Sequence, residues 1–251
     1  MNKKIIPVIL FSIGFLNIHA QTLPKIQESS LRAPDNIKID GKASEWNDQL
    51  QAYNTATDLF YTIANDDKNL YLIIQAKKAL PVTKIGQKGI TFTIQRSGKK
   101  EYNDGMGITY PTTKLTFIFL AGPYNPATAD SLMLKSNNLI RDMVKDIRVT
   151  GIKDIDTSIS VYNEQGIKAV CLFDNKRVLT YELAIPLKVL GLSLNDPIKF
   201  AYNVRLNGLS MSNPQFNDTE NAMAREALSR ATAMMSAVTD FWGEYTLAKK
   251  P

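Results

Sequence analysis

The chain of 251 residues carries 30 Lys and Arg against 24 Asp and Glu, which gives a formal net charge of +6 at pH 7. The basic residues are scattered rather than gathered in one stripe, which argues against a nucleic-acid reader. The single histidine is His19. Since it lies in a segment that we expect to be removed on export, the mature chain would lack the imidazole that Ser–His catalysis and most zinc or haem sites use.

Residues 1–20 have the three-part pattern of a secretory signal peptide. Lys3 and Lys4 give a basic start, an apolar run extends over residues 5–16, and Ala20 is a small residue at the expected cleavage point. The apolar run is shorter than the roughly 20 residues that span a bilayer. The pattern predicts an exported protein, periplasmic or extracellular, with no transmembrane segment in its mature part. The alternative is an uncleaved N-terminal anchor.

The rest of the chain is expected to form one domain. Residues 21–34 are polar and end in Ala-Pro, which is typical of a leader or linker, and residues 35–251 suit a single β-sandwich. A short strand is expected over 37–40, followed by a turn or short helix around Trp46. The lone Cys171 lies in an apolar run and is expected to pack as a small hydrophobe.

The clearest hairpin joins residues 58–64 to residues 70–76 through the turn-forming residues between them. Both runs are apolar on both faces, which predicts a central place in a sheet. Residues 96–113 read as a long polar loop. Further strands are expected over 90–95, 115–120, 159–161, 168–173, 178–185, 198–206 and 240–248.

Apolar stripes predict two helices, over 128–146 and 219–237. The second has capping-box spacing between Asn217 and Glu220. Many short strands with frequent turns and two helices favour a mainly β protein, specifically a β-sandwich or jelly roll with two accessory helices.

Three short blocks occur in order across residues 35–206. Residues 37–41 read as a strand ending in Asp-Gly, with Trp46 close behind. Residues 64–72 form an Asp-rich turn that enters Leu-Tyr-Leu, and residues 179–187 form a strand that ends in Ala-Ile-Pro. Together these blocks resemble the family 9 carbohydrate-binding modules and their wider superfamily. The resemblance implies a β-sandwich that, in several members, binds sugars and accompanies glycan-degrading catalytic domains.

A sugar site of this kind needs flat rings to stack on pyranose faces and polar side chains to bond the hydroxyl groups. Sugar-binding members clamp the ligand between two tryptophans. Here Trp46 matches a framework residue, and Trp242 begins the final strand. Loop position and the polar face of a strand indicate the ligand-binding candidates, for each of which a surface or packing role is the alternative. They are Tyr102, Asn103, Asp104, Tyr110, Tyr124, Arg205 and Trp242.

No cofactor is predicted. Some members of the resembled superfamily carry structural calcium, and two aspartate pairs would be the ligands here. No EF-hand spacing is present, and turn formation is the alternative explanation for both pairs. The pairs are Asp66 with Asp67 and Asp154 with Asp156.

These patterns favour a non-catalytic module that binds extracellular carbohydrate, with an exposed groove and at least two ring faces. One alternative is a structural or partner-binding protein of the bacterial envelope without sugar affinity, which predicts an exposed apolar patch or a paired sheet edge. The other is a histidine-free enzyme acting on glycans, which needs two carboxylates facing each other across a cleft. Glu101, Asp104 and Glu164 are the groups available for that role.

Overall fold

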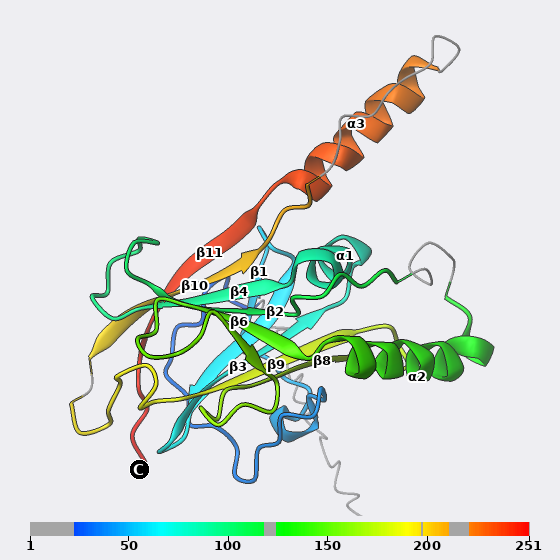
Figure 1. Ribbon diagram of the computed structural model, residues 1–251. Helices are drawn as coiled ribbons and strands as arrows, with labels where there is room; N and C mark the ends of the chain where they lie inside the picture. The colour runs from blue at the N-terminus through cyan, green and yellow to red at the C-terminus, as the bar shows by residue number, and fades with distance from the viewer. Residues whose placement is uncertain (1–22, 118–123, 197, 211–220, 251) are drawn as a thin grey trace, which may run out of the picture.

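Two antiparallel β-sheets packed face to face form the body of the protein (Figure 1). The computed structural model describes residues 23–117, 124–196, 198–210 and 221–250. The expected signal peptide, the expected capping pair Asn217 and Glu220, and the second half of the strand expected over 115–120 lie outside the described residues. The mainly β sandwich expected from the sequence is confirmed.

The first sheet has five strands in the order β1-β2-β3-β9-β8. The hairpin of β2 and β3 lies within the sheet, with β3 between β2 and β9, as its two apolar faces predict. The strands are β1 (Ala52–Asn54), β2 (Leu59–Asn65), β3 (Asn69–Ala76), β8 (Lys168–Phe173) and β9 (Leu179–Pro186).

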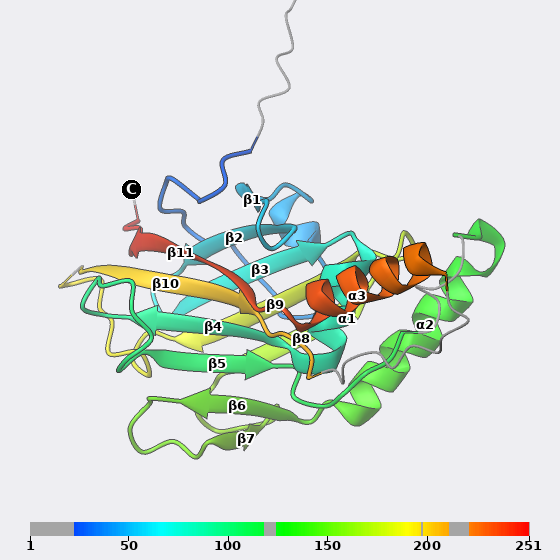
Figure 2. The ribbon, with the colours of Figure 1, turned by 90° about the horizontal axis from the view of Figure 1, so that it is seen from above.

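The second sheet has six strands in the order β11-β10-β4-β5-β6-β7, which Figure 2 shows side by side. Its central strands alternate between apolar residues that face the first sheet and polar residues on the outer face. The strands are β4 (Ile90–Gln95), β5 (Met106–Tyr110), β6 (Asp146–Thr150), β7 (Ser158–Ser160), β10 (Lys199–Leu206) and β11 (Thr239–Thr246).

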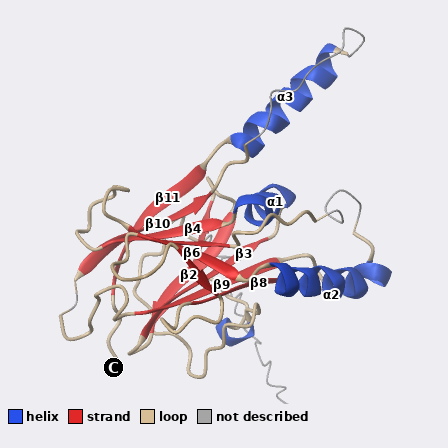
Figure 3. Cartoon of the chain, viewed as in Figure 1, coloured by secondary structure: helices blue, strands red, loops and turns tan. Residues whose placement is uncertain are grey.

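Three α-helices lie at one end of the sandwich (Figure 3). They are α1 (Ala79–Lys88), α2 (Pro126–Met143) and α3 (Ala222–Ser236). Helix α1 buries Val82 and Ile85. Helix α2 packs along β8, where the Asn137 amide accepts from the Phe173 N–H and donates to its carbonyl, each at 2.8 Å. Helix α3 projects away from both sheets and buries none of its residues.

The structure corrects several expected elements. Helix α1 was not expected, so the count of two helices is wrong. Residues 106–110 of the expected loop form β5, which pairs with β4 and β6. The helix expected over 128–146 ends at Met143, and its last expected residue, Asp146, instead begins β6. Residues 37–40 form no strand, nor do 115–117.

The main core fills the space between the sheets. Its centre is aromatic, with Tyr61, Phe92 and Tyr202 fully buried. The hydroxyls of Tyr61 and Tyr202 lie 3.1 Å apart and so join one sheet to the other. No helix among the described residues has the length and apolar character needed to cross a membrane.

A smaller core covers the outer face of the first sheet. The segment that contains the short 3-10 helix η1 (Ser44–Trp46) crosses that face, and Trp46 and Leu50 pack there with Tyr71 and Ile73. Trp46 is only 5% exposed. Its ring is therefore framework and takes no part in a surface site.

Candidate functional site

The candidate site lies on the outer face of the second sheet, where β10 and β11 pair. Phe200, Tyr202 and Val204 of β10 point into the core, so the intervening Asn203 and Arg205 stand on the opposite face. Asn203 lies directly opposite Trp242, and Arg205 lies opposite Asp240. Since directly opposed residues of an antiparallel pair share a face, these four side chains are neighbours.

The loop between β4 and β5 brings Tyr102 onto the same face. The Tyr102 hydroxyl donates a hydrogen bond to Asp240 Oδ2. Its ring centroid lies 5.2 Å from that of Trp242, with the ring planes tilted by 50°. The Arg205 guanidinium carbon lies 4.0 Å from the Tyr102 ring centroid. We call Tyr102, Asn203, Arg205, Asp240 and Trp242 the aromatic–arginine cluster.

Hydrogen bonds hold the loop and the acid of the cluster in place. The Gln95 side-chain amide of β4 donates to the Asn103 carbonyl at 2.5 Å. The Asn203 amide donates to Asp240 Oδ2 at 2.7 Å and to the Phe241 carbonyl at 3.0 Å. Asp240 Oδ2 thus receives two donors, one from the loop and one from β10.

Two polar atoms of the cluster, Arg205 Nε and Asn203 Oδ1, are buried without a hydrogen-bond partner among the described residues. Within the described part of the chain, the contact of the Arg205 guanidinium is the face of the Tyr102 ring. Arg205 is thus a partly buried cation beside an aromatic ring, without an ion pair to any described acid, and is available to a ligand.

Two basic residues, Lys100 of the loop after β4 and Lys199 of β10, also flank the cluster near Glu244 of β11. Glu244, two positions beyond Trp242 on the same face, pairs with Lys199 and, at 3.3 Å, with Lys100. Hydrogen bonds from Lys199 and Lys100 lower the pKa of the Glu244 carboxyl. Two cations share one carboxylate, so this edge of the cluster keeps a surplus of positive charge.

The structure brings together three of the seven residues predicted for the site, namely Tyr102, Arg205 and Trp242. Asn103 contributes a backbone carbonyl to the loop, and Asp104 adopts a φ of 57° in the turn beside it. Sequence reasoning missed Asn203 and Asp240. The alternation that places Arg205 on the outer face also places Asn203 there, and Asp240 lies two positions before Trp242 and so shares its face. Strand alternation could therefore have indicated both residues.

The prediction that Tyr110 binds a ligand at the surface is wrong. It is the last residue of β5, it is 3% exposed, and its ring lies 6.1 Å from that of Tyr181 in the core. Burial raises the pKa of its hydroxyl. A ring enclosed between the sheets cannot stack on a sugar at the surface.

Tyr124 is exposed but lies apart from the cluster. Its hydroxyl donates to the Asn175 carbonyl at 3.2 Å, and the Arg177 guanidinium lies 5.3 Å from its ring. These contacts join it to the turn between β8 and β9 of the first sheet. Tyr124 therefore belongs to a different surface.

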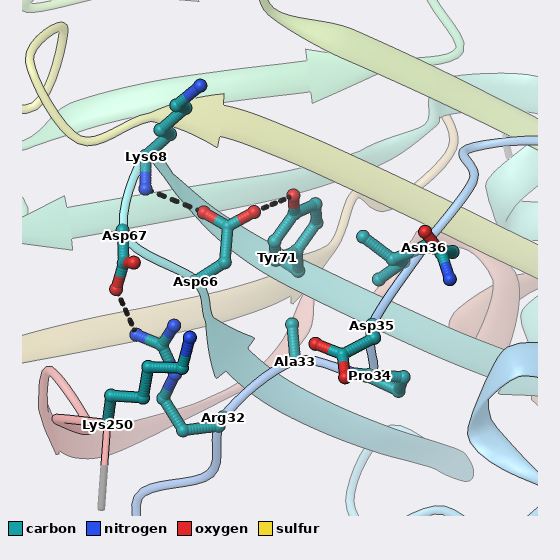
Figure 4. A pocket seen from close by; sticks show the side chains of 11 residues that line it. Arg32, Ala33, Pro34, Asp35, Asn36, Asp66, Asp67, Lys68, Tyr71 and Lys250 are labelled. Carbon is teal, nitrogen blue, oxygen red and sulfur yellow. Dashed lines mark hydrogen bonds and ion pairs between the residues drawn. The ribbon is translucent and has the colours of Figure 1, made fainter.

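A hollow apart from the cluster lies at the turn between β2 and β3 (Figure 4). It has a volume of about 690 Å³. Asp66 accepts from the Lys68 and Asn69 N–H groups and, at 2.6 Å, from the Tyr71 hydroxyl. Burial acts to raise the pKa of Asp66, but these hydrogen bonds outweigh it and lower the pKa. Its carboxylate is thus committed to the turn.

The aspartates considered for calcium have other partners or other roles. Asp67 pairs with Arg32 at 2.8 Å, and Asp154 adopts a turn conformation with φ of 59°. Among the described residues, no three His, Cys, Asp or Glu side chains are grouped as a metal site.

One buried carboxyl group, that of Glu182 on β9, has a raised pKa. Burial raises it to about 7, against the opposing effect of hydrogen bonds from the Gly41 and Asp40 N–H groups. Those bonds, 2.8 and 2.9 Å long, both end on Oε2. Since the residue is 1% exposed and bonded to backbone, it holds a segment of the fold in place.

A comparison of the chain with protein-family models and with curated proteins finds no match in either.

Proposed function

We propose that this protein is an exported, non-catalytic carbohydrate-binding module and that the aromatic–arginine cluster is its sugar site. The observation that carries the proposal is the convergence of two rings, Tyr102 and Trp242, with the polar groups of Arg205 and Asp240 on one sheet face. Three segments distant in the sequence supply these groups. The resemblance to the family 9 modules and the signal-peptide pattern point the same way.

The chemistry of the cluster suits a sugar. Tyr and Trp rings combine a large apolar face with a polar edge, and a pyranose offers C–H faces and hydroxyl rims in the same arrangement. Arg205 and Asp240 supply a donor and an acceptor at the margin of the rings. Three of these groups, Arg205, Asp240 and Trp242, stand on paired strands, which fix a binding geometry better than mobile loops do.

Retention of the purified protein on insoluble polysaccharides and on a soluble glycan array tests the proposal. The test variants are Tyr102→Ala and Trp242→Ala, and the matched control is Tyr124→Ala. The control tyrosine is 48% exposed, against 46% for Tyr102, but lies on the other surface.

We expect each test variant to lose retention by about tenfold or more, equivalent to ~1.4 kcal/mol, while the control binds as the parent does. Circular dichroism and thermal melting check that each variant is folded. If the folded parent is retained by no glycan, or if both test variants bind as well as it does, the proposal is wrong.

A second candidate function is partner binding through α3. It is motivated by the large apolar side chains that α3 exposes, among them Met223 at 76% and Met234 at 56%. Apolar groups gathered on a projecting element are typical of a protein-binding surface. Photocrosslinking from position 228 in the source cells, with position 97 as control, tests it. A specific adduct from position 228 alone would favour this function, and equal labelling from both positions would dismiss it.

A further inference from the structure

We infer that the ligand of the aromatic–arginine cluster is an acidic glycan and that Arg205 binds the carboxylate of one of its uronic acid residues. This inference rests on the proposed function and names the ligand class of the same site.

The first argument is that Arg205 forms no ion pair with an acid in the described part of the chain. Asp240 lies opposite Arg205 in the strand pairing, yet its Oδ2 accepts from Asn203 and Tyr102, and no ion pair joins it to Arg205 among the described residues. The Arg205 Nε is buried and has no hydrogen-bond partner in the described part of the chain, whereas the residue as a whole is partly exposed. Partial burial of a charged group costs free energy, and an anion bound at the exposed part of the guanidinium would offset that cost.

The second argument is geometric. Stacking on the Tyr102 ring restricts the plane of the guanidinium, whose carbon lies 4.0 Å from the ring centroid. A guanidinium held in one plane presents a fixed fork of donors that matches a planar carboxylate in bidentate fashion. A neutral hydroxyl would use one arm of that fork.

The third argument is the charge beside the cluster. Lys100 and Lys199 share Glu244, so the next outward position of β11 keeps a net positive charge. Residues 242 and 244 are separated by roughly 7 Å along the strand. A polymer lying across the rings would therefore meet cationic groups at two successive places, which favours a polyanion over a neutral chain.

The experiment compares acidic polymers with forms of the same polymers that lack the charge. Polygalacturonate, alginate and glucuronoxylan are each paired with their methyl-esterified derivative, and dextran sulfate serves as a sulfated polyanion. Affinity is measured by calorimetry and by affinity gel electrophoresis at 50 and 300 mM salt. The proteins are the parent, Arg205→Gln, Arg205→Lys and the control Arg148→Gln, an exposed outward arginine of β6 in the same sheet.

We expect the parent to bind at least one acidic polymer about tenfold more tightly than its ester. Arg205→Gln should remove that preference, so that it binds the acid no more tightly than the ester, and Arg205→Lys should restore the preference only in part, because a lysine keeps the charge without the fork. Arg148→Gln should match the parent.

Each other outcome contradicts the inference. Equal binding of every acid and its ester shows that no carboxylate is recognised, and an undiminished preference in Arg205→Gln shows that Arg205 does not recognise it. In either case the proposed function stands if Trp242→Ala still abolishes retention. Dextran sulfate bound as tightly as the best uronate, with both lost at 300 mM salt, shows general polyanion attraction instead. Failure to bind any acidic or neutral glycan ends both proposals together.

Discussion

Glu182 of β9 accepts a hydrogen bond of 2.8 Å from the backbone N–H of Gly41, a residue 141 positions earlier in the chain. The bond fastens the segment that carries Trp46 to the outer face of the first sheet. Gly41 suits this contact because its φ is +83° and a Cβ there would lie 2.8 Å from the Leu172 side chain. The buried Glu182 carboxyl group and Gly41 thus help to keep the segment of the smaller core packed on the sheet.

Stability should depend on pH through Glu182. Its pKa in the folded protein is about 7, above its ordinary value of 4.5, so between these values the folded state keeps a proton that the unfolded state has released. The contribution of Glu182 to the free energy of unfolding should therefore be fully present below about pH 4.5 and be lost as the pH rises to about 7, by roughly 3 kcal/mol.

Urea denaturation at pH 5, 6, 7 and 8 measures this dependence. The variant Glu182→Gln keeps an acceptor for the Gly41 N–H but does not titrate, so its stability should change less over the same range. Parallel curves for the two proteins would show that Glu182 is not responsible.

The variant Gly41→Ala should be destabilised by about 2–4 kcal/mol, because the new methyl group meets Leu172 and the residue keeps a positive φ. Gly98→Ala is the control. Gly98 also has a positive φ, of +75°, but its nearest neighbour is a backbone oxygen at 3.3 Å, so it should lose only about 1–2 kcal/mol. Equal losses in the two variants, measured by denaturation, would contradict the crowding at Gly41.

Asp66 should matter far more than its neighbour Asp67. Asp66→Ala removes acceptors for Lys68, Asn69 and Tyr71 in the β2–β3 turn and should cost about 1–3 kcal/mol. Asp67→Ala removes one surface ion pair with Arg32 and should cost about 0.5 kcal/mol or less. Thermal melts of both variants decide the order, and a greater loss in Asp67→Ala would reverse our reading of the turn.

Tyr102→Phe separates the ring from the hydroxyl in the aromatic–arginine cluster. It keeps the contacts with Trp242 and Arg205, and Asp240 still accepts from Asn203. We expect stability to fall by about 1 kcal/mol or less, with glycan retention much closer to the parent than to Tyr102→Ala. Retention as poor as in Tyr102→Ala would show that the Tyr102 hydroxyl and its hydrogen bond to Asp240, rather than the ring, are needed for binding.

Local patterns predicted the regular part of the fold. Strict alternation marked residues 90–95 and 198–206, and turn chemistry marked the hairpin of β2 and β3. The strand β5 was not predicted because Met106–Tyr110 is short, contains Gly107 and follows a polar turn. Its status as a strand comes from pairing with β4 and β6, which no local pattern reveals.

The sequence indicated individual candidate residues for the site, but it did not indicate which of them lie together. Tyr102, Arg205 and Trp242 were candidates, but their meeting depends on the register of β10 with β11 and on the path of the loop after β4. Tyr110 was misjudged for the same reason: a tyrosine assigned to a loop lies in a strand whose inward face is buried.

The segment between β10 and β11 contains α3, and its described residues, 207–210 and 221–238, are here called the arm. Leu206 pairs with Thr239, so β10 and β11 pair up to the two ends of the arm, and the Leu209 N–H bonds to the Met235 carbonyl at 2.9 Å. Descendants of this chain could therefore lengthen, shorten or exchange the arm without altering the register of either sheet. Natural variation in length should gather here, while the strands that carry the aromatic–arginine cluster keep their spacing.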